Sequence, residues 1–204
     1  MIGIIDYGSG NVKAIANIYK KLNQDYFVTS EPEKLKEASH LVLPGVGAFD
    51  TTMNLLINSG LKQTLDELVL VKKVPIMGIC VGMQIMAESS EEGSEAGLGW
   101  IKGAVKKIDD GQLARKPKLP HMGWNDISIT RDNSILADVN SEKGFYFLHS
   151  YYVQPSTEAD VVATVDYGSD LTCVVRRENI IGIQFHPEKS HDNGVTVFKN
   201  FALI

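Results

Sequence analysis

The stretch that decides the fold is 75-PIMGICVGMQ-84, where an apolar strand pattern runs into a helix pattern around Cys80. Gly78 and Gly82 stand two positions before and after the cysteine, where larger side chains would collide in a sharp strand-to-helix turn; this is the cysteine form of the G-x-S-x-G nucleophile turn. Such a turn raises its side chain at the carboxyl edge of a sheet, beside a helix N-terminus that favours a thiolate. Cys80 is therefore a candidate nucleophile, and the N–H of Val81 a candidate oxyanion donor. The alternative is that Cys80 is a small buried hydrophobic residue.

Outward from this turn, the first half of the chain alternates strand and helix patterns. Short apolar segments at 2–5, 26–28, 41–45 and 74–80 predict buried strands. Helical spacing between these strands predicts three helices. The first covers about residues 12–22, the second begins with Asp50 as its N-cap and ends at Gly60, and the third contains Leu61, Leu65 and Leu68. This alternation is typical of βα units with a mostly parallel sheet.

The second half is dominated by strand patterns. We expect strands within 100–108, 124–129, 146–153, 160–167, 171–177 and 180–185, followed by a helix over 193–204. The sequence therefore predicts one α/β domain over residues 1–204, with a mostly parallel central sheet that is flanked by helices and extended by antiparallel strands in the C-terminal half.

Composition narrows the function classes. The 204 residues are 44% hydrophobic and 22% charged, as in a globular domain with its own core, and the net charge of −5 argues against nucleic-acid binding. The N-terminal segment has neither the basic region of a signal peptide nor the length of a membrane span, so we expect a cytoplasmic protein. Two cysteines, Cys80 and Cys173, are too few for a disulfide framework, and Cys173 is expected to be structural. The histidines and cysteines show no metal-ligand spacing, so no metal site is expected.

A second candidate catalytic segment is 182-GIQFHPEKS-190. A cysteine nucleophile needs an imidazole base, and the imidazole needs a third group that sets its tautomer. His186 and Glu188 are two residues apart and point the same way on an extended segment, which Pro187 is expected to maintain. These residues predict a Cys80–His186–Glu188 triad. The alternative is an exposed loop histidine beside a surface glutamate.

A third segment, 41-LVLPGVGAF-49, is a strand pattern that ends in a glycine-rich turn. Gly45 and Gly47 allow backbone conformations that other residues avoid, so an N–H of the turn Gly45-Val46-Gly47 can point into a site. The alternative is an ordinary connection between strand and helix.

In this order, the three segments resemble the class I (triad) glutamine amidotransferases along nearly the whole chain. Within that family the motifs are closest to the glutaminase subunit of imidazole glycerol phosphate synthase. They are DYGSGN (6–11), PGVGAF (44–49), GICVGMQ (78–84), PHMGWN (120–125), FLHSYY (147–152) and HPEKS (186–190).

This resemblance implies a glutaminase without a cofactor. Cys80 attacks the side-chain amide of glutamine, His186 transfers the proton, Glu188 orients His186, and a glutamyl thioester is hydrolysed. The implied oxyanion donors are the N–H of Val81 and an N–H from Gly45-Val46-Gly47. The implied glutamine-binding residues are Gly47, Gln84, Glu92, His149, Ser150 and Tyr151, although His149 and Ser150 could instead be strand-end residues with local hydrogen bonds.

The resemblance also implies a partner, a (β/α)8-barrel cyclase subunit that forms a heterodimer with this chain and receives ammonia for histidine biosynthesis. The implied docking face contains His121, Met122, Trp124, Asn125, Tyr146 and Lys189. The alternative for 121–125 is a buried turn; an exposed apolar patch around Trp124 favours the docking face. We also expect a resting state in which the N–H of the 45–47 turn points away from Cys80.

Departures from the family pattern leave other functions open. Ala14, Ile15, Val81 and His191 differ from the residues common there. A paralogous glutaminase that supplies another synthase, for example one that amidinates a sugar, would share the catalytic residues. A γ-glutamyl cysteine hydrolase that acts alone and a non-catalytic binding scaffold are the further alternatives; the intact triad argues against the scaffold.

Overall fold

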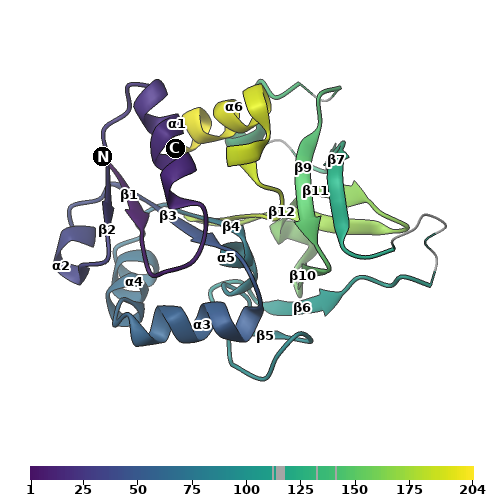
Figure 1. The fold of residues 1–204 in the computed structure, drawn as a ribbon, viewed down its shortest axis with the longest axis horizontal. Helices are drawn as coiled ribbons and strands as arrows, with labels where there is room; N and C mark the ends of the chain where they lie inside the picture. Colours follow the sequence, from purple (N-terminus) through teal and green to yellow (C-terminus); the bar gives the residue numbers. More distant parts are fainter. Residues whose placement is uncertain (112, 114–117, 132, 141) are drawn as a thin grey trace.

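An eight-stranded mixed sheet forms the centre of the computed structural model, which describes residues 1–111, 113, 118–131, 133–140 and 142–204 (Figure 1). The strand order is β2-β1-β3-β4-β13-β12-β11-β8. The first five are parallel: β2 (Tyr26–Thr29), β1 (Ile2–Ile5), β3 (His40–Gly45), β4 (Ile76–Cys80) and β13 (Ile180–Ile183). The last three are antiparallel: β12 (Asp170–Arg177), β11 (Val161–Asp166) and β8 (Ser128–Ile129). The predicted fold class is confirmed.

Helices cover both faces of the parallel strands, which explains why β1 and β4 are apolar throughout. Figure 1 shows α1 (Val12–Lys21) and α6 (His191–Phe201) on one side of the sheet and α3 (Phe49–Asn58) and α4 (Lys62–Asp66) on the other. The remaining helical segments are α2 (Pro32–Leu35), α5 (Val81–Gln84), a π-helical continuation of α4 (Glu67–Val71) and 3-10 turns at Ser134–Leu136, Glu158–Asp160 and Pro187–Lys189.

One helix prediction needs correction. Asp50 is not the N-cap of α3, because Ala48 takes that position and the Asp50 carboxylate accepts backbone N–H groups from Ser94 (2.9 Å) and Glu95 (3.0 Å). Asp50 therefore ties the 94–95 loop to the helix start. The helix expected directly after Cys80 is present as the single turn α5. Gly60 does follow the end of α3 with a positive φ of 74°, as predicted.

The second half forms two small sheets beside the large one. β7 (His121–Asn125) pairs antiparallel with β9 (Phe145–His149), and β10 (Tyr151–Pro155) lies in the order β10-β6-β5 with β6 (Gly103–Lys107) and β5 (Ser89–Ser90). The prediction of one strand over 146–153 is wrong, because the chain changes pairing partner at Ser150, from β7 to β6. The segment 124–129 is likewise split between β7 and β8.

The buried apolar side chains form a core cluster that includes residues from the first strand and from the last helix. Tyr19 of α1 meets Phe198 of α6 edge to face, with ring centroids 5.3 Å apart. Among the described residues, no helix is both long and apolar enough to cross a membrane.

Candidate active site

Cys80 lies at the sharp turn between β4 and α5, with φ 54° and ψ −114°. These backbone angles are rare for a residue other than glycine, and tight packing around the turn holds them in place. A Cβ at Gly78 would lie 2.8 Å from the carbonyl oxygen of Gly82, and a Cβ at Gly82 would lie 2.0 Å from the carbonyl oxygen of Leu43. The glycine at position 78 therefore keeps the turn itself clear, and the glycine at 82 lets the end of β3 approach it.

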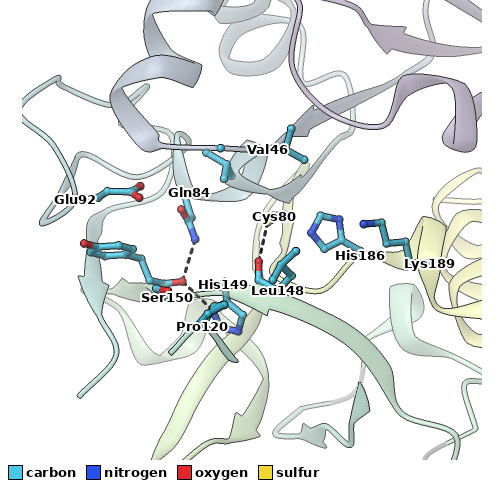
Figure 2. A pocket seen from close by; sticks show the side chains of 13 residues that line it. Val46, Cys80, Gln84, Glu92, Pro120, Leu148, His149, Ser150, His186 and Lys189 are labelled. Atoms are coloured by element: carbon cyan, nitrogen blue, oxygen red, sulfur yellow. Dashed lines mark hydrogen bonds between the residues drawn. The ribbon is translucent and has the colours of Figure 1, made fainter. Parts of the chain in front are cut away.

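The Cys80 side chain is only 4% exposed, but it lines a cavity of about 300 Å³ (Figure 2). We expected the turn to lift this side chain toward solvent; in the structure it faces a cavity and not the open surface. The cavity brings together predicted residues from both halves of the chain: Val46, Gly47, Cys80, Val81, Gln84, Glu92, His149, Ser150, Tyr151, His186 and Lys189. Pro120 and Leu148 also line it and were not predicted.

His186 and Glu188 form a buried pair beside Cys80, with His186 Nδ1 2.9 Å from Glu188 Oε1. Burial alone would lower the pKa of His186, but its contacts with the Cys80 thiol and with Glu188 outweigh burial and raise it. The ring therefore binds a proton readily, and the geometry suits a thiolate–imidazolium pair. Figure 2 shows His186 and Gln84 on opposite sides of Cys80.

The backbone between His186 and Glu188 differs from the prediction. Pro187 does not keep the segment extended; it begins the 3-10 turn Pro187–Lys189, and only His186 has an extended conformation. The two side chains meet because this turn brings Glu188 back toward the ring. The Ser190 hydroxyl supports the turn by donating to the carbonyl oxygen of His186 at 2.7 Å.

The glycine-rich turn after β3 is held by the N-terminal motif at 6–11. Ser9 Oγ accepts the N–H of Val46 (3.0 Å) and donates to the carbonyl oxygen of Val46 (3.1 Å), and the Tyr7 hydroxyl donates to the carbonyl oxygen of Pro44. The N–H of Val46, one of the predicted oxyanion donors, is therefore bonded to Ser9. Gly47 has a positive φ of 95° and faces the cavity.

A row of neutral hydrogen bonds runs along the wall opposite His186. The Tyr151 carbonyl oxygen accepts from His149 Nδ1 (2.9 Å), so this nitrogen carries the hydrogen, and His149 Nε2 accepts from His121 Nδ1 (3.0 Å). Burial is the main cause that lowers the pKa of His149 to about 4, which keeps this ring neutral. The same carbonyl oxygen accepts from Gln84 Nε2 at 3.0 Å.

Glu92 lies at the edge of the cavity, where Oε2 accepts the N–H of Phe49 at 2.8 Å. This backbone group is the first of helix α3, so the carboxylate lies at the positive end of the helix. Glu92 thereby joins the 44–49 turn to the small sheet that contains β5.

The predicted docking face is an exposed patch on the β7–β9 sheet. Met122 is 54% exposed and Trp124 is 48% exposed. In the antiparallel pair, Met122 lies opposite Leu148 and Trp124 lies opposite Tyr146. Lys189 places Nζ 5.6 Å from the Tyr146 ring centroid. The expected apolar patch around Trp124 is therefore present.

His121 is not part of this patch. Its side chain is 1% exposed and stacks between Phe147 and Tyr167, so the prediction that it lies on the docking face is wrong. The cause is the strand alternation, which turns His121 and Asn125 inward while Met122 and Trp124 point outward. The Asn125 amide accordingly donates to His121 Nε2 (3.3 Å) and to the carbonyl oxygen of Asp166 (2.9 Å).

Sequence reasoning missed two polar residues. Ser9 was quoted in a motif without a role, and Gln184 was not singled out although its Nε2 lies 3.8 Å from Cys80 Sγ. The signal for Gln184 was its position two residues before His186, because such residues share a face of an extended chain. No cluster of three or more His, Cys, Asp or Glu that could hold a metal occurs within the part of the chain that the structure describes.

Comparison with known proteins gives full-length matches. A family model described as glutamine amidotransferase class-I matches residues 3–204. The chain is 50% identical over 202 residues to the imidazole glycerol phosphate synthase subunit HisH of Leptospira borgpetersenii, covering 99% of both chains. It is 43% identical over 204 residues to the protein of the same name in Bdellovibrio bacteriovorus, covering both chains fully.

Solved structures show the same fold at low sequence identity. A crystal structure of a glutamine amidotransferase superimposes with a TM-score of 0.74 at 18% identity, covering 100% of this chain and 99% of that one. A putative GMP synthase subunit from Thermoplasma acidophilum gives 0.73 at 22% identity, covering 98% and 91%. With a match to the family model over residues 3–204, this chain belongs to the class-I glutamine amidotransferases.

Proposed function

We propose that this chain is the glutaminase subunit of an imidazole glycerol phosphate synthase, which hydrolyses glutamine and supplies ammonia for histidine biosynthesis. The observation that carries the proposal is the cavity in which Cys80, at a strained strand-to-helix turn, lies beside the buried His186–Glu188 pair. The full-length identity of 50% to a HisH subunit supports the choice of synthase. We take residues 1–204 to act as one glutaminase domain in the cytoplasm.

In the proposed reaction, His186 takes the proton of the Cys80 thiol, and the thiolate attacks the side-chain amide carbon of glutamine. His186 then gives its proton to the leaving nitrogen, so that ammonia departs and a glutamyl thioester remains on Cys80. A water molecule attacks the thioester with His186 as base, which releases glutamate and restores the thiol. Glu188 keeps the hydrogen on Nδ1 of His186, so that Nε2 exchanges protons with the reacting groups.

The oxyanion of each tetrahedral intermediate is assigned to the N–H of Val81 and to an N–H of the turn 45–47. The hydrogen bond between Val46 N–H and Ser9 Oγ supports a resting state that lacks the second donor. Activation then requires the turn to reorient, and binding of the partner or its ligand is the proposed cause. Such a device limits glutamine hydrolysis to times when ammonia can be used.

The glutamine substrate is assigned to the remaining cavity walls, whose volume of about 300 Å³ suits a small ligand. Both amide hydrogens of Gln84 are engaged, with the Tyr151 carbonyl and with Gln184, so Gln84 offers the substrate its oxygen. Glu92 offers a carboxylate to the substrate ammonium group. Gly47, His149, Ser150 and Tyr151 complete the proposed binding surface.

The proposed partner is a (β/α)8-barrel cyclase that docks on the patch of Met122, Trp124, Tyr146 and Lys189. Exposed aromatic side chains and methionine are typical of the centre of a protein interface, whereas a lysine such as Lys189 suits its polar rim. Because Leu148 belongs to the same strand pair and also lines the cavity, ammonia formed at Cys80 is released close to this patch.

The test uses the chain co-purified with a barrel cyclase and supplied with the phosphoribosyl-formimino substrate. We expect turnover with either glutamine or ammonium as nitrogen source, and a Cys80→Ala complex that retains only the ammonium-dependent reaction. If the purified complex turns over with ammonium but not with glutamine, the glutaminase assignment fails. If glutamate forms without any cyclase product or stable complex, the choice of synthase fails instead.

A further inference from the structure

Gln184 is a fully buried glutamine at the end of β13, and its side chain reaches the candidate nucleophile. Its exposed fraction is 0%, and Nε2 lies 3.8 Å from Cys80 Sγ. Burying an amide among apolar residues costs free energy unless its polar atoms have partners. The partners of Gln184 therefore indicate what its amide does.

The orientation of this amide follows from a backbone carbonyl. The Tyr151 oxygen can only accept, so it must face the NH₂ group of Gln84, which lies 3.0 Å away. The same NH₂ group donates to Gln184 Oε1 at 3.1 Å. Gln184 thus turns its oxygen toward Gln84 and its own NH₂ group toward the sulfur. The flipped amide would set two NH₂ groups against each other and an oxygen against the sulfur.

We propose that Gln184 is a further catalytic residue, which donates a hydrogen bond to the sulfur of Cys80 and stabilises its thiolate. The inference rests on the proposed glutaminase function, in which that thiolate is the nucleophile. A neutral thiol sulfur is a weak acceptor, in keeping with the long 3.8 Å contact, whereas an anionic acceptor forms shorter and stronger hydrogen bonds. The bond therefore favours loss of the thiol proton.

The other groups near the sulfur do not replace this donor. The Leu148 carbonyl oxygen, 4.0 Å away, can accept from the thiol but has nothing to offer a thiolate. The titratable groups that face the site are His186 with Glu188 behind it, Tyr7, and four residues on the cavity walls: Glu92, His149, Tyr151 and Lys189. None of them changes when Gln184 is replaced, so a difference between variants reports on the amide.

The competing explanation is that Gln184 only supports Gln84. The two roles predict different measurements, because support of Gln84 acts on glutamine binding, whereas donation to sulfur acts on the reactivity of Cys80 before any substrate binds. Alkylation of Cys80 by iodoacetamide, a small carboxamide that suits the cavity, reports that reactivity directly.

The experiment follows carbamidomethylation of Cys80 in the full chain by mass spectrometry over about pH 5 to 10, which brackets thiol ionisation. Buried Cys173 serves as the internal reference. Gln184→Met has nearly the same shape but no donor, and we expect its alkylation inflection to move up by about one pH unit, with the rate near neutral pH roughly tenfold lower. Gln184→Glu presents a carboxylate to the sulfur and is expected to shift further. Gln154→Met, at an exposed position, is the matched control.

Glutaminase kinetics provide the second measurement. We expect Gln184→Met to lower kcat by about tenfold while KM changes less than about twofold. An unshifted alkylation profile with a raised KM overturns the proposal and leaves Gln184 as a support for Gln84. If the Met variant does not fold, Gln184→Glu decides alone, and an inflection at or below that of the unmodified chain refutes the donor role. Normal alkylation of the chain without glutamate formation in its complex with the barrel cyclase would instead refute the proposed function.

Discussion

Replacing Ser9 with alanine is expected to activate the isolated chain. Ser9 Oγ makes two hydrogen bonds to Val46, at 3.0 and 3.1 Å, which engage the Val46 N–H that is proposed as an oxyanion donor. Each contributes about 0.5–1.5 kcal/mol net, so their loss shifts the balance between the resting and reoriented turn by about 1–3 kcal/mol. Since 1–3 kcal/mol corresponds to a factor of about 5–150, we expect basal glutamine turnover to rise by a factor within that range.

The assay measures glutamate formed from glutamine by the isolated chain, without partner, for the unmodified protein, Ser9→Ala and the matched surface variant Ser156→Ala. Circular dichroism on heating checks that Ser9→Ala is folded. Because activation acts through the oxyanion donor, kcat should rise while KM stays nearly constant. A folded Ser9→Ala chain whose turnover equals that of Ser156→Ala would refute the assignment of this contact as the resting-state restraint.

Three further predictions concern the triad, the histidine pair and the docking patch. Glu188→Gln removes the charge that orients His186 and should lower kcat roughly 10²- to 10⁴-fold with little change in KM, measured by the same glutamate assay; a loss below about tenfold would contradict the role. His149 has its pKa lowered from 6.5 to about 4, so the unfolded chain binds this proton first. The neutral ring therefore stabilises the fold fully above pH 6.5, and up to about 3 kcal/mol of the free energy of unfolding is lost as the pH falls through 4. Urea unfolding at several pH values should show a weaker pH dependence of this free energy in His149→Asn, and an unchanged dependence would refute the prediction. Trp124→Ala should weaken binding of the barrel partner about tenfold or more in titration calorimetry. Val71→Ala, which changes an exposed apolar residue outside the patch, should bind normally, and equal effects of the two substitutions would count against the docking face.

Local spacing correctly predicted the sharp strand-to-helix turn at Cys80. The flanking glycines of Cys80 and the two-residue separation of His186 and Glu188 are short-range patterns, although Gly82 is needed because the end of β3 approaches the turn. The path between His186 and Glu188 was wrong because Pro187 is compatible with a 3-10 turn as well as with an extended chain. Contacts with Ser190 select between these conformations, and they depend on the start of α6.

Motif position alone could not decide which side of a strand faces a partner. His121 and Trp124 belong to one motif, yet alternation along β7 buries the first and exposes the second. The direction of that alternation depends on pairing with β9, which lies about twenty residues further along the chain.

By itself, the sequence determined the α/β class, the strand-to-helix turn at Cys80 and the closeness of His186 to Glu188, because apolar periodicity and residue spacing are properties of neighbours along the chain. Only the tertiary structure decided that Ser9 bonds to Val46, that Gln184 reaches Cys80, and that the thiol lines a cavity formed by both halves of the chain. Those contacts join residues 37 and 104 positions apart, and their geometry exists only once the parallel strands have packed side by side.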